Sequence, residues 1–260
     1  MDTLLAQLGL PLVALFCYMC ALFLLAVEKK DNSVADIAYG MGFAVIAWVG
    51  TFAYVAELAL IPTLLTLMVT VWGARLSLRI YLKNKGKPED FRYAKWRSEW
   101  KHFYARSFLQ VFMLQGLIIF IISLPVLLVD EEVKCVGFAC AGFAVWLVGL
   151  FFEARGDYEL DKYLAQPESK GHIMTTGLWK YTRHPNYFGE STMWWGIWLV
   201  SLSSIPMLWF VTLLSPVLIT FLLLKVSGVP LLEAKMSQHP EWSSYASKTN
   251  ALFPWPPRSK

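Results

Sequence analysis

Long apolar runs separated by short polar stretches dominate the pattern of this 260-residue chain. A helix needs about 20 apolar residues to cross the hydrocarbon of a bilayer. The last run is too long for one helix, and Pro206 divides it because proline cannot continue the helical hydrogen-bond ladder. The predicted spanning helices cover about residues 4–27, 35–56, 58–81, 108–129, 133–154, 192–203 and 206–226.

The polar segments between these helices are of unequal length. Two of them, 82–107 and 155–190, are longer than simple helix connections need to be. A polar tail follows at 227–260. The pattern therefore predicts one all-α membrane domain of seven transmembrane helices, residues 1–260, in which the two long loops form a binding lid.

Basic residues are concentrated at one end of the predicted helices. Segment 82–107 carries eight Lys or Arg and segment 155–190 carries five, whereas the turns near 57, 130–132 and 203 carry none. Lys and Arg accumulate in cytoplasmic loops of membrane proteins. We therefore expect the long loops and the C-terminus in the cytoplasm and the N-terminus outside, as in a bacterial inner membrane.

Composition agrees with an integral membrane protein. Hydrophobic residues make up 57% and charged residues 16% of the chain, against about 25% charged residues in soluble domains. The net charge of +4 is explained by the basic residues of the long loops, so it does not predict nucleic-acid binding. The cysteines lie in apolar runs and are expected to be buried structural thiols; they are Cys17, Cys20, Cys135 and Cys140. No ligand spacing joins the four histidines, so no metal site is expected.

Residues 177–190 are the most informative stretch: Gly-Leu-Trp-Lys-Tyr-Thr-Arg-His-Pro-Asn-Tyr-Phe-Gly-Glu. Asn186 and Glu190 are four residues apart and would share one face if a helix starts near Pro185. An asparagine can donate and accept hydrogen bonds at once, which suits a planar carboxamide. The alternative is an interfacial aromatic belt with a basic pair for lipid phosphates.

This stretch resembles the Asn-aromatic-x-Gly-Glu/Asp signature of membrane steroid and sterol reductases, in particular the steroid 5α-reductase family. Asp157-Tyr158 precedes the signature, and Tyr245 and the sequence Ala-Leu-Phe-Pro at 251–254 follow it, as in that family. Residues 84–88, Asn-Lys-Gly-Lys-Pro, resemble the segment through which the family holds its cofactor. The strong part of the resemblance covers roughly residues 153–257.

The resemblance implies an NADPH-dependent reductase of the Δ4 double bond of a 3-oxo steroid or a lipid-like enone, with the long loops closing over the nucleotide. Arg92 and Tyr93 are added to the implied cofactor contacts because they lie close to residues 84–88. The implied set is Asn84, Lys87, Arg92, Tyr93, Asp157, Tyr181, Arg183, His184, Asn186, Tyr187, Glu190 and Tyr245.

The substrate end of the site is also implied by the resemblance. Glu57 resembles a glutamate with which the family grips the substrate ketone, although the neighbouring family Gln is Ala56 here. The family has a tyrosine on its third helix that this sequence lacks, and Tyr54 is the nearest residue that could supply the missing hydroxyl. These two side chains would stabilise the developing enolate, as in an oxyanion hole. The substrate cavity is expected to include Met193, Trp194 and Trp195.

Two other functions stay open. Membrane methyltransferases of the isoprenylcysteine and phospholipid type carry a similar Arg-His-Pro-x-Tyr-x-Gly stretch. Their cofactor, S-adenosylmethionine, has no phosphates, whereas NADPH needs several Lys or Arg. The pair of Asn186 and Glu190 favours the reductase. The third possibility is a non-enzymatic sterol- or lipid-binding protein. The natural substrate and the oligomeric state do not follow from the sequence.

Overall fold

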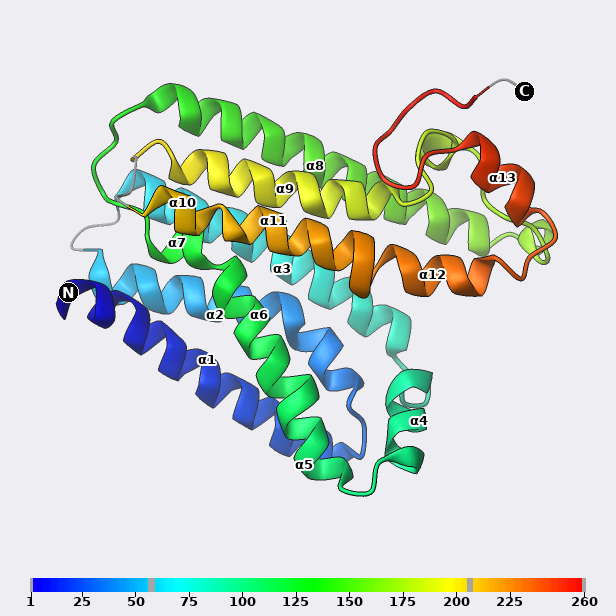
Figure 1. The fold of residues 1–260 in the computed structure, drawn as a ribbon, viewed down its shortest axis with the longest axis horizontal. Coiled ribbons are helices and arrows are strands. Elements are labelled where there is room, and N and C mark those ends of the chain that lie inside the picture. The colour runs from blue at the N-terminus through cyan, green and yellow to red at the C-terminus, as the bar shows by residue number, and fades with distance from the viewer. Residues whose placement is uncertain (1, 56–58, 205–207, 259–260) are drawn as a thin grey trace. The chain divides into compact units, whose positions relative to one another are not determined.

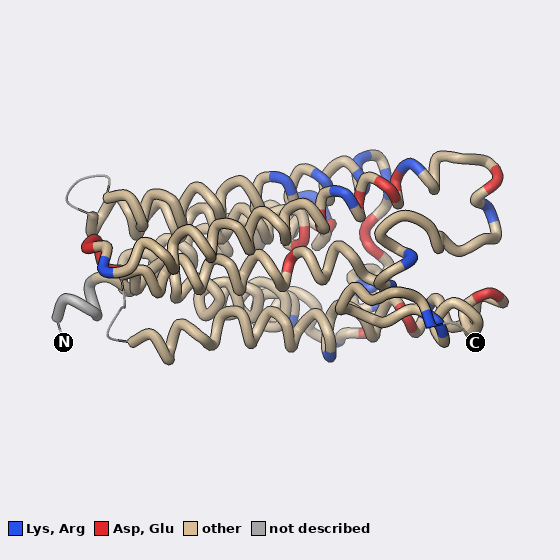
Figure 2. The backbone as a smooth tube through the Cα atoms, turned by 90° about the horizontal axis from the view of Figure 1, so that it is seen from above, with Lys and Arg blue, Asp and Glu red and all other residues tan. Residues whose placement is uncertain are grey.

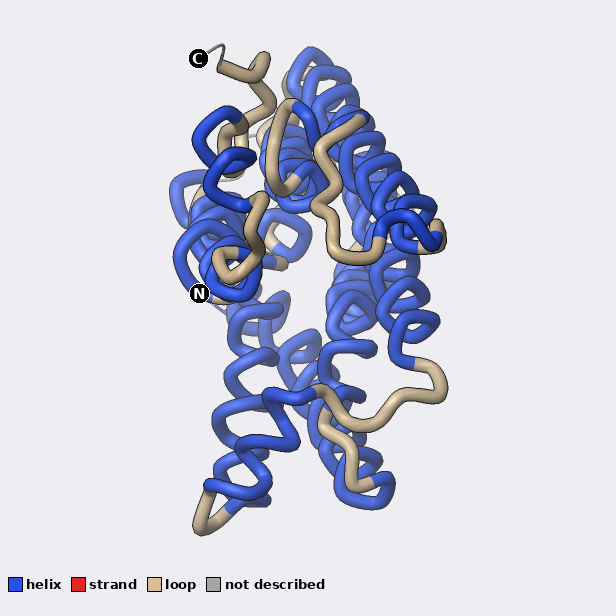
Figure 3. Tube along the Cα trace, turned by 90° about the vertical axis from the view of Figure 1, so that its right-hand side faces the viewer, coloured by secondary structure: helices blue, strands red, loops and turns tan. Residues whose placement is uncertain are grey.

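The computed structural model describes residues 2–55, 59–204 and 208–258, which form helices and loops without a strand (Figures 1 and 3). The chain divides into two compact units, whereas the hydrophobic pattern predicted one domain. The first unit comprises residues 1–135 and 201–212, and the second comprises residues 136–200 and 213–260.

In the first unit, α2 packs between α1 and α3. Gly40 of α2 faces Gly73 of α3 so closely that a Cβ atom on either would meet the backbone of the other. Phe43 and Trp72 pack edge to face beside this contact, with ring centroids 5.3 Å apart. The helices of this unit are α1 (Asp2–Lys29), α2 (Ser33–Tyr54), α3 (Leu60–Asn84), α4 (Phe91–Glu99), α5 (Phe103–Ser107), the π-helix η1 (Phe108–Met113), α6 (Leu114–Ile122), α7 (Leu124–Leu127) and α10 (Trp209–Thr212).

In the second unit, α8 and α9 lie side by side and are joined by a loop that contains two short 3₁₀ turns (Figure 1). A π-helical turn, η4, connects α11 to the C-terminal helices. The elements are α8 (Val136–Leu164), η2 (Pro167–Ser169), η3 (Gly177–Lys180), α9 (Pro185–Ser201), α11 (Leu214–Phe221), η4 (Leu222–Val226), α12 (Val229–Met236) and α13 (Trp242–Lys248).

Six helical stretches of the described residues are long and apolar enough to cross a membrane. They are Gln7–Lys29, Ser33–Tyr54, Leu60–Asn84, Phe103–Ile122, Val136–Leu164 and Trp209–Met236. The chain is therefore a membrane helical bundle. Seven spanning helices were predicted, and the remaining one corresponds to α9, which has 17 residues.

Several predicted boundaries are corrected by the structure. The fourth candidate span covers Phe103–Ile122 where 108–129 was predicted, and the last runs to Met236 where an end at 226 was predicted. The fifth helix was expected to end at 154, but α8 continues to Leu164, because Arg, Lys and Glu are nearly as good helix formers as Leu and Arg155 pairs with Glu159 one turn later. The sixth was expected to start at 192, but α9 starts at Pro185, where proline is well suited to the first helical position. Asn186 and Glu190 are thus helical.

Charged side chains gather at the helix ends, as the charge pattern along the chain predicted. Within each unit, most Lys and Arg residues lie toward one end of the helices (Figure 2). In the first unit the other end carries three consecutive acids and one lysine, namely Asp130, Glu131, Glu132 and Lys134.

The expected burial of the cysteines is wrong. All four are free, and none of them is buried: Cys17 and Cys140 are exposed, and Cys20 and Cys135 are half-buried. Cys17 lies on α1 and Cys140 on α8, both candidate spans, so their exposed surfaces suit contact with lipid. An apolar run shows that a helix enters the membrane but not which of its faces packs against protein.

A polar network fastens α4 to the start of α2. Arg92 donates to Asp36 through Nη2 at 2.7 Å and to Asp90 through Nε at 2.8 Å, and the Tyr93 hydroxyl donates to Asp36 at 2.6 Å. Burial would lower the pKa of Arg92, but hydrogen bonding to Asp90 and the charge of Asp36 outweigh it and raise the pKa. Burial and the Asp36 charge together raise the pKa of Tyr93. Both groups thus stay protonated donors at neutral pH.

Replacing Asp36 by alanine is expected to lower the melting temperature of the detergent-solubilised protein by several degrees, because the buried Tyr93 hydroxyl would lose its acceptor. Glu99→Ala is the matched control, because the Glu99 carboxylate lies on an exposed surface, with Lys95 at 3.9 Å as its ion-pair partner among the described residues. Equal melting temperatures of the Asp36→Ala variant and the control would show that the network does not stabilise the fold.

Candidate functional site

Glycines allow α8 and α9 to approach backbone to backbone. Gly142 and Gly149 of α8 are seven residues apart, as are Gly189 and Gly196 of α9. A Cβ on Gly142 would meet the backbone of Gly196, and a Cβ on Gly149 would meet that of Gly189. The last contact is between Gly156 and the Pro185 ring. The two helices therefore run antiparallel in close contact along their length.

Polar side chains converge at the end of this crossing where α8 leaves the apolar region. Glu153 and Asp157 are one turn apart on α8, and Glu190 lies on α9 next to Gly189, which touches Glu153. The three acids are 2%, 5% and 8% exposed. Buried carboxylates are costly unless they have partners, so such a group usually marks a functional site in a membrane protein. The part of the chain described here contains no group of three His, Cys, Asp or Glu arranged to hold a metal ion.

Asn186 lies one turn before Glu190 on the same helix, and its backbone nitrogen lies close to Gly156 of α8. Its side-chain Oδ1 is buried and has no hydrogen-bond partner among the described residues. A buried acceptor without a donor costs roughly 1–3 kcal/mol. Such groups are rare in native proteins and call for an explanation, and a donor from a bound molecule is one such explanation.

The loop before α9 is fastened to the C-terminal tail. Thr182 and Asn250 form an isolated bridge, and the Tyr245 hydroxyl donates to the Trp179 carbonyl at 2.5 Å. Trp179 in turn donates through its indole nitrogen to the Gly156 carbonyl of α8 at 3.0 Å. Burial raises the pKa of Tyr245, which keeps its hydroxyl a donor. Tyr245 thus has a structural partner, and its predicted cofactor contact stays a prediction.

Arg183 is surrounded by acceptors from this tail and from α12. Its Nε donates to Glu233 at 2.8 Å, and its Nη1 donates to the carbonyls of Thr249 at 2.6 Å and Ala246 at 3.1 Å. The guanidinium also lies 5.4 Å from the Trp242 ring centroid. A residue that the resemblance assigns to the cofactor therefore joins three segments of the protein.

Replacing Arg183 by alanine is expected to loosen the C-terminal segment and speed tryptic cleavage after Lys248 at least severalfold. The matched control is Arg258→Ala, because the Arg258 side chain is exposed and meets Asn250 only at 3.5 Å. Cleavage is followed by mass spectrometry of the detergent-solubilised protein. Unchanged cleavage in the Arg183→Ala variant would mean that the Arg183 side chain does not hold the tail.

His184 shares the Glu233 carboxylate with Arg183. Its Nε2 lies 3.1 Å from Glu233 Oε1, and its ring stacks on Tyr187 with centroids 5.4 Å apart. Burial lowers the pKa of His184 below its usual value, although the charge of Glu233 acts in the opposite direction. The ring is therefore neutral at physiological pH.

The predicted aromatic and apolar site residues of the second unit differ in their burial and contacts. Met193 and Trp194 are fully buried, and Met193 packs against Gly149 in the helix crossing. Trp195 donates through its indole nitrogen to Thr220 at 3.3 Å. Tyr181 is exposed, and its carbonyl accepts from the Trp255 amide at 3.0 Å. The structure gives Met193 a packing role in the helix crossing, and its predicted place in a substrate cavity stays a prediction.

The predicted cofactor residues of the first unit are not all available to a ligand. Lys87 is exposed and Asn84 is half-buried at the end of α3, so both can reach an incoming nucleotide. Arg92 and Tyr93 instead donate to Asp36, as described above. Their predicted contacts with a cofactor stay predictions.

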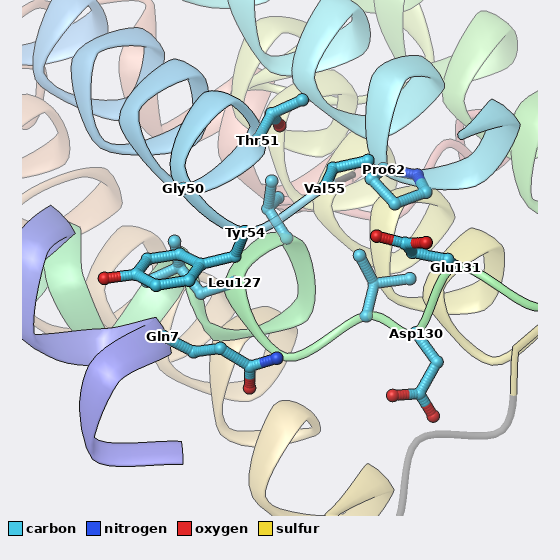
Figure 4. Close-up of a pocket in the computed structure, with 11 residues that line it drawn as sticks. Gln7, Gly50, Thr51, Tyr54, Val55, Pro62, Leu127, Asp130 and Glu131 are labelled. Atoms are coloured by element: carbon cyan, nitrogen blue, oxygen red, sulfur yellow. The ribbon is translucent and has the colours of Figure 1, made fainter. Parts of the chain in front are cut away.

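Tyr54 lines a cavity of about 210 Å³ at the C-terminal end of α2 (Figure 4). Gln7, Asp130 and Glu131 supply further polar groups to its wall. Pockets for drug-sized ligands usually measure about 300–1,000 Å³, so this cavity is small for a steroid. Glu57, the predicted partner of Tyr54, lies outside the described residues.

The first unit keeps Tyr54 apart from Asn84 and Lys87. Tyr54 ends α2 close to the start of α3, whereas Asn84 ends α3 after 25 residues. At about 1.5 Å per residue, α3 is about 37 Å long. The predicted catalytic hydroxyl and the predicted nucleotide contacts therefore lie at opposite ends of this helix.

Two acids of the second unit, the buried Glu153 and the half-buried Glu233, escaped the sequence analysis. Glu153 lies inside the predicted span 133–154, one turn before Asp157, and a carboxylate inside a predicted span is a sufficient signal. Glu233 has no such signal, because it lies in a polar tail and meets Arg183 across 50 residues.

An all-helical bundle with membrane-length helices and buried acids at their ends defines an integral membrane protein with a polar site. The chain belongs to the family described as "Protein of unknown function (DUF1295)", which it matches over residues 22–249.

Over 63 residues, 24% of its length, the chain is 41% identical to "3-oxo-5-alpha-steroid 4-dehydrogenase 1" of Mus musculus, and it matches the Rattus norvegicus protein of that name equally well. The match spans about a quarter of each relative, 24% of its length. No solved structure matches the chain significantly. The partial match supports a distant link to the steroid 5α-reductase family.

Proposed function

We propose that this protein is a membrane reductase that uses NADPH to reduce the double bond of an α,β-unsaturated ketone in an apolar substrate, of which a Δ4-3-oxo steroid is the model. The partial identity to a 3-oxo-5-alpha-steroid 4-dehydrogenase supports the reaction class. The observation that carries the proposal is the buried Oδ1 of Asn186, which lacks a donor among the described residues.

The residues of the second unit fit a nicotinamide. A carboxamide NH₂ group is a donor that the Asn186 oxygen can accept. The buried Glu190 follows Asn186 by one turn on α9, and the buried Asp157 follows Gly156, which lies close to the Asn186 backbone. Lys87 belongs to the first unit, and its phosphate contact stays a separate prediction that its exposed side chain allows. When bound, the reduced nicotinamide supplies the hydride that the reaction needs.

The protein's own groups would orient the nicotinamide and shield it from water. Asn186 would fix the plane of the carboxamide, and the closely packed α8 and α9 would exclude water from the reacting face. Reduction adds a hydride to the β-carbon and a proton to the α-carbon, so the product gains two hydrogens. The proposal gives Tyr54 no catalytic role. Tyr54 ends α2 near the start of α3, whereas the predicted nucleotide contact Asn84 lies at the other end of α3.

The proposed topology follows from the charges. Lys and Arg accumulate in cytoplasmic segments, so residues 85–106 and the C-terminal tail would face the cytoplasm, where NADPH is available. The N-terminus of α1 would then face the opposite side.

The test is oxidation of NADPH by the purified protein in detergent, followed at 340 nm with and without progesterone as the Δ4-3-oxo steroid. Steroid-dependent oxidation with a product two hydrogens heavier would support the proposal. NADPH binding without turnover would support the cofactor and exclude progesterone as substrate. Thermal stabilisation by S-adenosylmethionine but not by NADPH would overturn the proposal in favour of a membrane methyltransferase.

A further inference from the structure

Glu233 contacts two side chains of the segment before α9 with one oxygen. Its Oε1 accepts from Arg183 Nε at 2.8 Å and lies 3.1 Å from His184 Nε2. A carboxylate paired with a guanidinium is ionised, and an ionised carboxylate can only accept hydrogen bonds. The Nε2 of His184 must therefore carry the hydrogen of this contact.

The second ring nitrogen of His184 is then an acceptor. In a neutral imidazole with its hydrogen on Nε2, Nδ1 presents a lone pair. His184 is 4% exposed, and its Nδ1 is buried without a hydrogen-bond partner among the described residues. Stacking on Tyr187, with an interplanar angle of 16°, fixes the plane of the ring. The orientation and the tautomer of the ring are thus set before any ligand arrives.

His184 Nδ1 and Asn186 Oδ1 are two buried acceptors on either side of Pro185, both in need of donors. A phosphate offers mainly acceptor oxygens and would be repelled by these lone pairs. A ribose hydroxyl, an amine or a carboxamide offers hydrogens. The nearby cation, Arg183, is already bonded to Glu233, Ala246 and Thr249.

We propose that His184 accepts a hydrogen bond through Nδ1 from a hydroxyl or N–H group of the bound nucleotide, and that Glu233 is the positioning residue that sets the required tautomer. The stretch from Arg183 to Asn186 then contacts the uncharged ribose and carboxamide portions and not the phosphates. The contact with the nucleotide rests on the proposed function, whereas the His184 tautomer set by Glu233 is a property of the protein alone.

The first experiment determines the tautomer by ¹⁵N NMR of histidine-labelled full-length protein in detergent. The chain has four histidines, and the His184 signals are assigned by their loss in a His184→Asn variant. We expect a protonated Nε2 and an unprotonated Nδ1 in the wild type, and a mixture of tautomers in Glu233→Gln, because a glutamine amide can donate as well as accept. A protonated Nδ1 in the wild type would overturn the assignment, whether or not the protein binds NADPH.

The second experiment compares two replacements of His184 by their affinity for NADPH and NADH. In His184→Gln the amide reaches the Nε2 position and can still donate to Glu233, but no acceptor remains at the Nδ1 position. In His184→Asn the amide can present its oxygen near the Nδ1 position. We expect His184→Gln to lose roughly fivefold to tenfold in affinity for both nucleotides, about one hydrogen bond, and His184→Asn to lose less.

Lys87→Ala is the control for a phosphate contact, because it should weaken NADPH more than NADH and reduce the salt dependence of binding. A selective loss of NADPH affinity in the His184 variants would overturn the proposal, and so would unchanged affinity in both. If the wild type binds neither nucleotide, the proposed function fails, while the tautomer measurement still decides the role of Glu233.

Discussion

Replacing Gly189 by alanine is expected to separate α8 from α9 and to lower the melting temperature by about 5–10 °C, taking an overpacking cost of about 1–3 kcal/mol or more and roughly 2–4 °C per kcal/mol. The new methyl group would meet the backbone nitrogen of Glu153 and the carbonyl of Gly149. Backbone atoms in a packed helix pair cannot turn aside as a flexible side chain can, so the helices themselves must move. Thermal unfolding in detergent, read by size-exclusion chromatography after heating, measures the effect.

Gly9→Ala is the matched control for this change. Gly9 also lies in a long helix, α1, but a Cβ atom there would have no neighbour within 4 Å. Alanine favours a helix over glycine by about 1 kcal/mol, so Gly9→Ala should melt at the wild-type temperature or slightly above it. If Gly189→Ala behaves like Gly9→Ala, the close crossing of α8 and α9 is not what holds the second unit together.

Replacing Asn186 by leucine is expected to abolish nucleotide-dependent activity while leaving the fold intact or more stable. The buried Oδ1 of Asn186 lacks a donor, a deficit of roughly 1–3 kcal/mol that leucine removes. The same change removes the acceptor for the carboxamide and puts a branched apolar group in its place. NADPH affinity should fall by at least about tenfold, equivalent to about 1.4 kcal/mol, as measured by equilibrium binding.

Asn32→Leu provides the contrast, because the same substitution there should destabilise the protein. Asn32 is 2% exposed and its Nδ2 donates to Ser107 at 2.7 Å. A lower melting temperature for Asn186→Leu together with unchanged NADPH affinity would show that Asn186 serves the fold and would remove the main support for the proposed function.

The membrane helices could be predicted from the sequence because burial in lipid imposes a simple requirement. A run of about 20 apolar residues has few alternatives to a spanning helix. The candidate spans from Ser33 and Leu60 begin within two residues of the predicted starts at 35 and 58. The ends of α8 were harder to predict, since its last ten residues lie beyond the apolar run and are helical through local pairs such as Arg155 with Glu159.

The site could be predicted only where its residues lie close together in the sequence. Asn186 and Glu190 share a helix turn, so their spacing alone places them on one face. The role of Arg183 could not be predicted, because an arginine beside a predicted site is equally suited to a phosphate and to an internal carboxylate. Its partner Glu233 is 50 residues away. Arg92 has the same ambiguity, and its partner Asp36 is 56 residues away.

The sequence by itself determined that this chain is a membrane protein of apolar helices and that a polar Arg-His-Pro-Asn stretch precedes the sixth of them. These properties depend on hydrophobicity and on spacings of a few residues. The tertiary structure decided which charges are already paired, which glycines bring α8 and α9 together, and that His184 Nδ1 and Asn186 Oδ1 are buried without donors. Those properties depend on contacts between segments far apart in the chain, which no local pattern encodes.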